Sequence, residues 1–362
     1  MKSALGRVLF TGALTTAVLA AGGGVAAGDE VVETLIPGLE GSRAIDIGRN
    51  GWVFLADSQG RLFEHNGRLG GELRQVNQLP VGGFLGGPSS ISFTRQGNGW
   101  ILYSQEGGPD DTVAYDLYKL NPGHGPVFVA DIADYQVTDP DPFDLEDNPT
   151  ESNPFDVEML DDRSALVADA AGNDILRVFP DGTIQTVACF APTLAPTDHL
   201  PPEFGFPPGT EIPSERVPTS VAVGPDGWWY VGTLAGFPAA PGTSEVWRID
   251  PSSVGAGCDP AGPPNPFGDP YAEDLTSIVD IAFGNGGALF VVELHEDGWL
   301  LGESDPDPTG SGRLWRIDPR GRTELAHGHL AIPGGIAIGR SSIYAINWFL
   351  VPGANEVLRI TP

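Results

Sequence analysis

The chain has 362 residues, of which 48 are acidic and 19 are basic, so its formal net charge at pH 7 is −29. Such an acidic surface repels nucleic acids and anionic lipids, and this disfavours both as partners. The 50 glycines and 34 prolines fall at the ends of predicted strands, where they indicate turns rather than disorder.

Residues 1–27 have the composition of a secretory signal peptide. Two basic residues precede an apolar segment at residues 8–21, and residues 25–27 (Val-Ala-Ala) form a small-residue cleavage site. The apolar segment is too short and too rich in Gly and Ala to favour a membrane span, and no later segment qualifies. We therefore expect cleavage after Ala27, a secreted or periplasmic location, and one domain over residues 28–362.

A hairpin pattern recurs six times along the mature chain. Its clearest copy is VPTSVAVGPDGWWYVGT (residues 217–233), in which an apolar run, a Gly-Pro-Asp-Gly turn and an aromatic run follow one another. Glycine, Asn and Asp supply the positive φ angles that tight turns need. The other copies begin near Ser42, Ser90, Pro154, Ser277 and Pro333.

A second motif follows five of these hairpins: two apolar residues, a basic residue, an apolar residue, any residue and proline. A more polar run comes next, such as PVFVADIADY (residues 126–135), and we expect it to be a fourth strand. Six units of four antiparallel strands predict an all-β, six-bladed β-propeller. A stack of separate sandwiches is the alternative, but regular spacing without linkers favours the propeller. The five copies lie at residues 116–122, 174–180, 245–251, 313–319 and 356–362.

The two ends of the chain predict how the ring closes. Residues 356–362 are the third strand of the sixth blade, and no fourth strand follows them. An unassigned strand, VVETLIP (residues 31–37), begins the mature chain. We expect it to pair with residues 356–362 and to complete the sixth blade.

The basic residue of the second motif has a fixed place in the third strand. Because this place lies away from the central channel, we expect salt bridges between blades rather than a binding ring. Blade one has Glu64 at the equivalent position. The basic residues are Lys119, Arg177, Arg248, Arg316 and Arg359.

Cys189 and Cys258 are the two cysteines of the chain. A disulfide is the default for a cysteine pair in an exported protein. Cys189 ends the fourth strand of blade three, and Cys258 lies in a long loop of blade four. We therefore expect a bond between adjacent blades, with Cα atoms about 5.5–6 Å apart.

Four segments of the chain together form a specific pattern: ESNPFDV (residues 151–157), VADAAGNDILRV (167–178), VPTSVAVGPDGWWYVGTLAGFP (217–238) and IVDIAFGNGGALFVVE (278–293). They resemble the exported ScyD/ScyE family, which is common in actinobacteria. This resemblance implies a six-bladed propeller without an established reaction. More distantly, the blades are similar to NHL-type repeats and to gluconolactonase-like propellers.

The gluconolactonase-like kinship implies a divalent metal at the channel mouth, held at the start of several innermost strands. The turns align Phe155, Thr219 and Val279 with those ligand positions, and none of the three is a good ligand for a hard cation. Asp156 and Asp280 lie one residue later, so a shifted metal site is possible, with Glu293 as a third ligand.

The ends of the second strands should meet the starts of the first strands around the channel. The polar residues there predict a ligand-binding mouth, which could also hold Ca²⁺. The alternative is that they cap loops, as Asp and Asn often do. The acidic segment at residues 139–153 and the Pro-rich segment at residues 192–215 should be solvated loops. The predicted ligand-binding residues are Asp57, Glu106, Asp156, Asp169, Asp280, Glu293 and Asn347.

We expect an exported, monomeric, non-catalytic binding or scaffold protein that uses this acidic mouth. Its ligand would be a small molecule, a cation or a loop of an extracellular protein. The reason is that no acid–base pair, nucleophile or metal-ligand set is assembled in the sequence. The alternative is a metal-assisted lactonase or hydrolase, in which His295 beside Glu293 would be the acid–base group.

Overall fold

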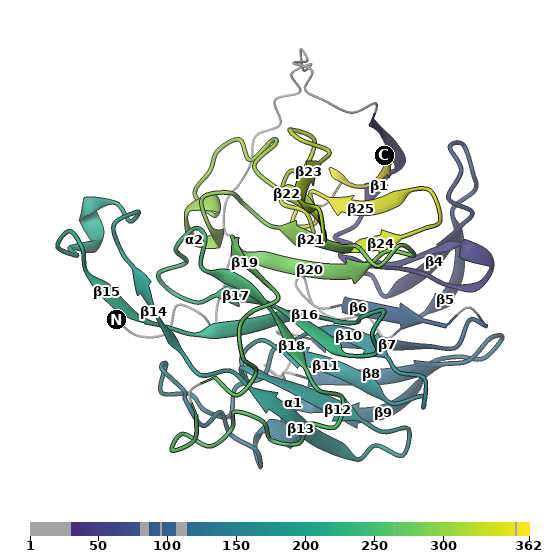
Figure 1. Ribbon diagram of the computed structural model, residues 1–362. Helices are drawn as coiled ribbons and strands as arrows, with labels where there is room; N and C mark the ends of the chain where they lie inside the picture. Colours follow the sequence, from purple (N-terminus) through teal and green to yellow (C-terminus); the bar gives the residue numbers. More distant parts are fainter. Residues whose placement is uncertain (1–29, 80–86, 95, 106–113, 264, 352) are drawn as a thin grey trace.

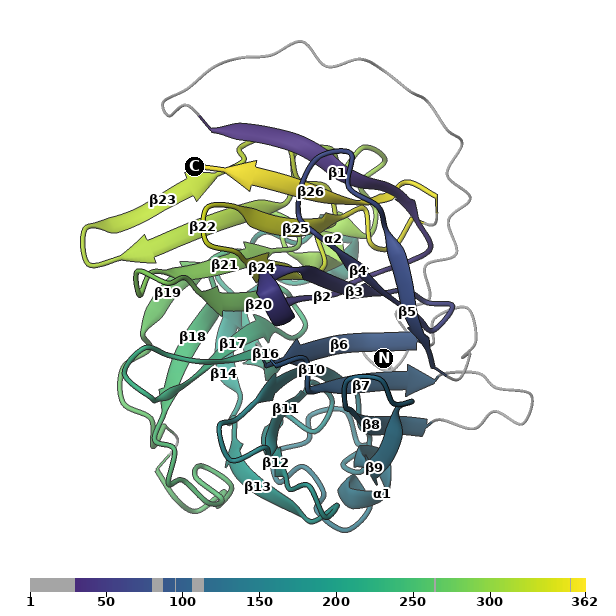
Figure 2. The same ribbon diagram turned by 90° about the vertical axis from the view of Figure 1, so that its right-hand side faces the viewer.

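Six antiparallel sheets of four strands surround a central axis in the computed structural model (Figures 1 and 2). The structure describes residues 30–79, 87–94, 96–105, 114–263, 265–351 and 353–362. The innermost strands contact one another in sequence order, and the last contacts the first, so the ring is closed. This confirms the six-bladed propeller. The predicted signal peptide and Glu106 lie outside the described residues.

The first three blades are continuous in sequence, and their strands run from the channel outward in chain order. Blade one contains β2 (Ala44–Ile47), β3 (Val53–Ala56), β4 (Arg61–His65) and β5 (Arg74–Gln78). Blade two contains β6 (Gly87–Phe93), β7 (Gly99–Gln105), β8 (Ala114–Leu120) and β9 (Val127–Asp131). Blade three contains β10 (Pro154–Met159), β11 (Ala165–Asp169), β12 (Asp174–Val178) and β13 (Ile184–Cys189).

Blades four and five repeat this plan, and blade six combines both ends of the chain. Blade four contains β16 (Arg216–Val223), β17 (Trp229–Ala235), β18 (Ser244–Ile249) and β19 (Ala272–Leu275). Blade five contains β20 (Ile278–Phe283), β21 (Leu289–Glu293), β22 (Arg313–Asp318) and β23 (Gly321–Leu325). Blade six contains β24 (Ile336–Ile338), β25 (Ile343–Asn347), β26 (Asn355–Thr361) and β1 (Val31–Leu39).

The core lies between the blades, because each sheet packs both faces against neighbouring sheets. One cluster, for example, joins Trp100 and Leu102 of blade two to Val167 and Leu176 of blade three, and all four side chains are buried. Burial on both faces explains why the inner strands are nearly continuous apolar runs. None of the helices in the described residues is long and apolar enough to cross a membrane.

The sixth blade closes as the sequence predicts. Strand β1 pairs antiparallel with β26, with Val32 opposite Ile360 and Val31 opposite Thr361. Leu35 and Ile36 are buried in the cluster between blades six and one. The N-terminal strand therefore supplies both the missing hydrogen bonds and part of the core.

The disulfide between Cys189 and Cys258 is present and joins blade three to blade four. Its Cα atoms are 4.8 Å apart, closer than the expected 5.5–6 Å. The reason is a parallel bridge between Ala188 and Ala256, in which the N–H of Cys189 also donates to the Ala256 carbonyl. This backbone pairing draws the loop of blade four against the edge of β13.

The expectation of salt bridges between blades was wrong for the four arginines of the third strands. Arg177 pairs with Asp162 at 2.5 Å, and Arg248 pairs with Asp226 at 2.6 Å. Both carboxylates belong to the turn between the first two strands of the same blade, beside the third strand. Three further pairs at these positions also lie within one blade: Arg316 with Asp318, Arg359 with Glu33, and Glu64 with Arg74.

Two connecting segments differ from their predicted form. The fourth strand of blade two ends at Asp131, whose carboxylate accepts a hydrogen bond from Asp134 N–H and caps the short helix α1 (Ile132–Gln136). The Pro-rich segment contains a hairpin of β14 (Thr193–Pro196) and β15 (Glu211–Ser214), which projects from the ring in Figure 1. Three further short helices are η1 (Arg49–Gly51), η2 (Pro202–Phe204) and α2 (Trp299–Gly302).

Candidate ligand-binding channel

The six innermost strands enclose a central cavity of about 900 Å³. Residues of β2, β6, β10, β16, β20 and β24 all line it. Because equivalent strands run in the same direction, their starts define one end of the channel, which we call the mouth. Phe155, Phe349 and Arg43 lie there.

Asp156 and Asp280 line the channel near its mouth. A β-bulge precedes each of them, between Pro154 and Asp156 in β10 and between Ile278 and Asp280 in β20. The extra residue of a bulge changes which side chains face a given side of the strand. This explains why the acids stand one residue after the positions that the turn alignment indicated.

The channel-side edge of each inner strand has N–H groups without a strand partner, and the acidic side chains satisfy several of them. Asp156 accepts from Val221 N–H of blade four at 2.8 Å and from Ser90 Oγ of blade two at 2.6 Å. Asp280 accepts from Ile336 N–H of blade six at 2.6 Å. Each carboxylate therefore joins its blade to the next.

Two further acids line the channel deeper in, and the sequence analysis missed both. Asp46 accepts from Phe93 N–H at 2.6 Å, and Glu158 accepts from Ser92 Oγ at 3.0 Å. They hold equivalent places in blades one and three. The sequence does contain a signal for them. Each is an acidic residue inside an apolar first strand, where it cannot serve to cap a loop.

The four channel acids line the cavity, but the six blades surround them on all other sides. This burial is the main influence on their protonation. Burial raises the pKa of Asp46 to about 7 and that of Glu158 to about 8. Burial also raises the pKa of Asp156, and it raises the pKa of Asp280 well above its usual range, with the charge of Asp156 adding to the shift. Near pH 7 the channel therefore retains protons that a bound cation would displace.

Arg43 introduces a positive charge at the mouth. Its guanidinium lies 3.7 Å from the centroid of the Phe155 ring and donates to the Phe155 carbonyl at 3.2 Å. This is a cation–π contact, and it shows that the ring accepts a cation on its face. The positive charge also lowers the pKa of Asp156, against the larger effect of burial.

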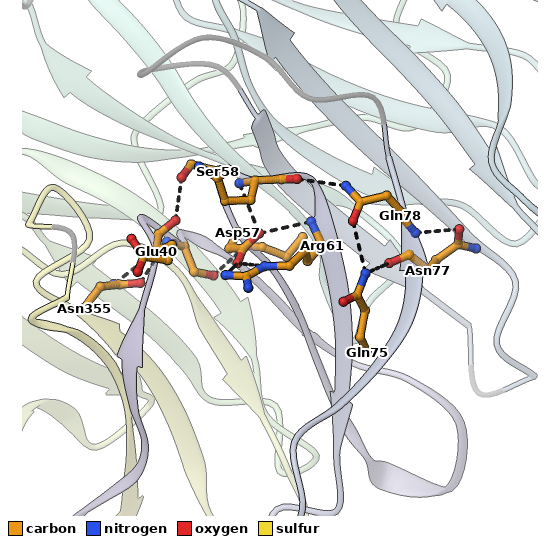
Figure 3. A network of polar contacts seen from close by, with 11 residues as sticks. Glu40, Asp57, Ser58, Arg61, Gln75, Asn77, Gln78 and Asn355 are labelled. Carbon is orange, nitrogen blue, oxygen red and sulfur yellow. Dashed lines mark hydrogen bonds and ion pairs between the residues drawn. The ribbon is translucent and has the colours of Figure 1, made fainter.

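The predicted residues at the ends of the second strands lie elsewhere. Asp57 is fully buried and accepts hydrogen bonds from Gln59 N–H, Arg61 N–H and Arg61 Nε at 2.8–3.1 Å. Figure 3 shows its carboxylate turned toward Arg61, beside the contacts of Ser58 and Gln78. Asp57 thus holds the turn between β3 and β4.

Three other predicted residues also hold connecting segments of the chain through hydrogen bonds. Asp169 accepts from Ser152 Oγ at 2.6 Å, Glu293 accepts from Thr276 N–H at 2.7 Å, and Asn347 accepts from Ala331 N–H at 2.7 Å. None of these residues, nor Asp57, lines the cavity. Their part in ligand binding stays a prediction, and the channel acids are the better candidates.

His295 is buried in the loop after β21 and does not line the cavity. Its Nε2 lies 3.1 Å from Asp305 Oδ2, and its Nδ1 accepts from Asp297 N–H at 3.1 Å. Among the described residues, no three His, Cys, Asp or Glu side chains are grouped so that they could hold a metal ion. The structure therefore does not bring Glu293 and His295 into one group with Asp156 and Asp280.

No family model matches the chain, and no curated protein matches its sequence. Among solved structures, a glucose dehydrogenase is 12% identical, with a TM-score of 0.56, over 91% of this chain and 99% of the other. A putative oxidoreductase (glucose dehydrogenase) from Thermus thermophilus is 18% identical, with a TM-score of 0.52, over 91% and 99%. A putative gluconolactonase is 13% identical, with a TM-score of 0.48, over 92% and 93%. At such identities the likeness to the two dehydrogenases shows the six-bladed propeller fold alone.

Proposed function

We propose that this chain is an exported, non-catalytic binding protein that takes a small organic cation in its central channel. The observation that carries the proposal is the set of four carboxyl groups that face one cavity of about 900 Å³. A cavity of this size suits a small molecule. The acids are Asp46, Asp156, Glu158 and Asp280.

The lining supports a cation that has an apolar part. Phe155 and Phe349 provide aromatic surface at the mouth, and the carboxyl groups provide negative charge once a bound cation displaces their protons. A quaternary or protonated amine gains from both, because aromatic faces attract cations and carboxylates pair with them. The net charge of −29 favours the approach of the same class of ligand.

Export and the family resemblance belong to the proposal as well. The disulfide between Cys189 and Cys258 is compatible with an oxidising compartment. The resemblance to ScyD/ScyE proteins, which rests on the sequence segments, agrees with the propeller fold. Neither bears on which ligand is bound.

Calorimetric titration with diamines, quaternary ammonium compounds and neutral sugars tests the proposal. We expect an amine or ammonium compound to bind, and to bind more tightly as the pH rises and the channel acids ionise. Asp156→Asn should weaken this binding, since it removes a negative charge from the cavity. Arg43→Ala should strengthen it, since it removes the competing charge above Phe155.

Two matched variants serve as controls. Asp181→Asn and Arg320→Ala remove the same charges from exposed hairpin turns and should leave the affinity unchanged. If sugars bind and amines do not, the ligand class is wrong. If Asp156→Asn and Arg43→Ala do not move the affinity in opposite directions, the channel is not the binding site.

A metal-assisted lactonase remains the second candidate, favoured by one observation. Asp156 and Asp280 face the same cavity, and their charges influence each other. Two carboxylates with raised pKa values are typical of sites that move protons. Turnover of a lactone or ester panel in Mn²⁺, Zn²⁺ or Ca²⁺, lost in both Asp156→Ala and Asp280→Ala, would replace the binding proposal with this one.

A further inference from the structure

A second polar cluster lies between blades two and three, outside the channel. It consists of the carboxylates of Asp169 and Asp174 and the amide of Gln136. The two acids are cross-strand partners in β11 and β12, and Gln136 is the last residue of α1, which lies beside β12 and β13 in Figure 1. The exposed fractions are 0% for Asp169, 3% for Asp174 and 0% for Gln136.

The hydrogen bonds of this cluster leave two buried oxygens without a donor. Gln136 Nε2 donates to Asp169 Oδ2 at 3.2 Å and to Asp174 Oδ2 at 3.1 Å. Asp174 Oδ1 and Gln136 Oε1 have no partner in the part of the chain that the structure describes, although both atoms are inaccessible to solvent. Buried acceptors without a donor are rare in folded proteins and call for an explanation.

The charges of the cluster are also uncompensated. Among the described residues, the donors that contact Asp169 are Gln136, Ser152 and backbone N–H groups, and the one that contacts Asp174 is Gln136, so all of these donors are neutral. Burial, followed by the charge of Asp169, raises the pKa of Asp174 well above its usual range. Two adjacent buried carboxylates without a basic partner need a proton or a metal ion.

We propose that Asp169, Asp174 and Gln136 bind one divalent cation of the hard, oxygen-seeking Ca²⁺ type. A half-turn of the Gln136 amide exchanges Nε2 and Oε1, whose assignment depends on the hydrogen-bond network. The amide oxygen then faces both carboxylates from the place where the nitrogen now lies. Two carboxylates neutralise the ion, and carboxylate and amide oxygens are the ligands that Ca²⁺ prefers.

The backbone leaves room for this arrangement at Gly172. A Cβ atom there would lie 2.3 Å from Gln136 Nε2 and 3.4 Å from Asp169 Cγ, so a larger residue would displace the amide. The set contains only two acids. It is therefore consistent with the absence, among the described residues, of a metal-binding group of three His, Cys, Asp or Glu.

The cation would fasten the acidic segment at residues 139–153 to blade three. Ser152 Oγ donates to Asp169 at 2.6 Å, and Asn153 N–H donates to it at 2.7 Å. Gln136 precedes the same segment in the chain. The ion would thus join both ends of the segment to the β11–β12 hairpin.

Thermal unfolding and calorimetry of the mature protein with Ca²⁺ alone, after treatment with EDTA, test the site. We expect one Ca²⁺ per chain and a melting temperature that rises with the logarithm of the Ca²⁺ concentration. Asp174→Asn should reduce Ca²⁺ affinity at least about tenfold. In EDTA the same variant should melt above the wild type, because a neutral amide needs neither the proton nor the metal ion that the buried Asp174 carboxylate needs.

Two controls make the outcome decisive. Asp181→Asn, in an exposed turn of the same blade, should bind Ca²⁺ like the wild type, and so should Asp156→Asn in the channel. If the wild type neither binds Ca²⁺ at about 10 mM nor changes its melting temperature, the proposal is overturned, whether or not Asp174→Asn folds. If Asp174→Asn binds Ca²⁺ unchanged, or Asp156→Asn abolishes binding, the ion lies elsewhere and the proposal is equally overturned.

Discussion

Asp156 Oδ2 accepts a 2.8 Å hydrogen bond from the N–H of Val221 and thereby joins the inner strand of blade three to that of blade four. Asp46 and Phe93 join blades one and two in the same way, and Asp280 and Ile336 join blades five and six. The channel acids therefore stabilise the ring as well as giving the cavity its charge. A ligand that needs them ionised must compete with burial, which favours their protonated form.

The pH dependence of stability should reflect this burial. Glu158 has a pKa near 4.5 when unfolded and about 8 when folded, so between these values the folded state alone keeps the proton. The free energy of unfolding should fall as the pH rises through this window, by about 1.4 kcal/mol per pKa unit. Urea denaturation from pH 4 to pH 9 should show this fall in the wild type and a flatter profile in Glu158→Gln.

Asp162 provides a control, because its pKa is shifted in the opposite direction to that of Glu158. Its partial burial is outweighed by hydrogen bonds from Ser164 and by the guanidinium of Arg177, so its pKa is lowered. The stability that it contributes is present above its usual pKa and is lost as the pH falls. Asp162→Asn should therefore leave the slope between pH 5 and pH 8 as in the wild type. An unchanged slope in Glu158→Gln would contradict the assignment of the buried proton.

The N-terminal strand should be essential for the stability of the ring. Ile36 is 4% exposed and packs in the cluster between blades six and one. Ile36→Ala should lower the free energy of unfolding by about 2–5 kcal/mol. Val31→Ala removes an apolar side chain that is 49% exposed in the same strand, and it should cost about 0.5 kcal/mol or less. Equal melting temperatures for the two variants would show that β1 does not stabilise the closed ring.

The disulfide should stabilise the protein by restricting the unfolded chain. Cys189 and Cys258 are 69 residues apart, and loop closure of this length is worth about 4 kcal/mol in the chain-entropy account. Cys189→Ser combined with Cys258→Ser should lower the urea midpoint accordingly. Addition of a reductant should shift the wild type toward the variant and leave the variant unaffected. Two free thiols in the unfolded, unreduced wild type would refute the bond.

Substitution of Asp57 tests whether this residue caps a turn or binds a ligand. Asp57→Ala leaves the N–H groups of Gln59 and Arg61 without their acceptor, which should cost about 1–3 kcal/mol. The affinity of the channel for the best amine should stay within about twofold, since Asp57 does not line the cavity. Ser58→Ala, in the same turn, is the control for stability. A large loss of affinity in Asp57→Ala would restore the ring of second-strand ends as the binding site.

The sequence by itself determined the number of blades and the strand pairing that closes the ring. The same pattern recurs in every blade: hairpin turns with Gly, Asn and Asp, and strands rich in apolar and aromatic residues. It recurs because each blade packs between two neighbouring blades in the same way. The sixth unit shows three strands in the sequence, and residues 31–37 form a strand that belongs to no hairpin, so their pairing could be predicted. The cysteine pair could be assigned because only one pairing exists.

The tertiary structure alone decided which acids face the channel. A bulge before Asp156 and Asp280 changes the facing of the strand by one residue, and the turns that the sequence displays do not record it. It also decided the partners of the third-strand arginines, since distance in space selects the nearest carboxylate of the same blade. Finally, it brought Gln136 from one blade connection to Asp169 and Asp174 of the next. Contacts of this kind depend on how two blades pack, and no local pattern in either segment specifies them.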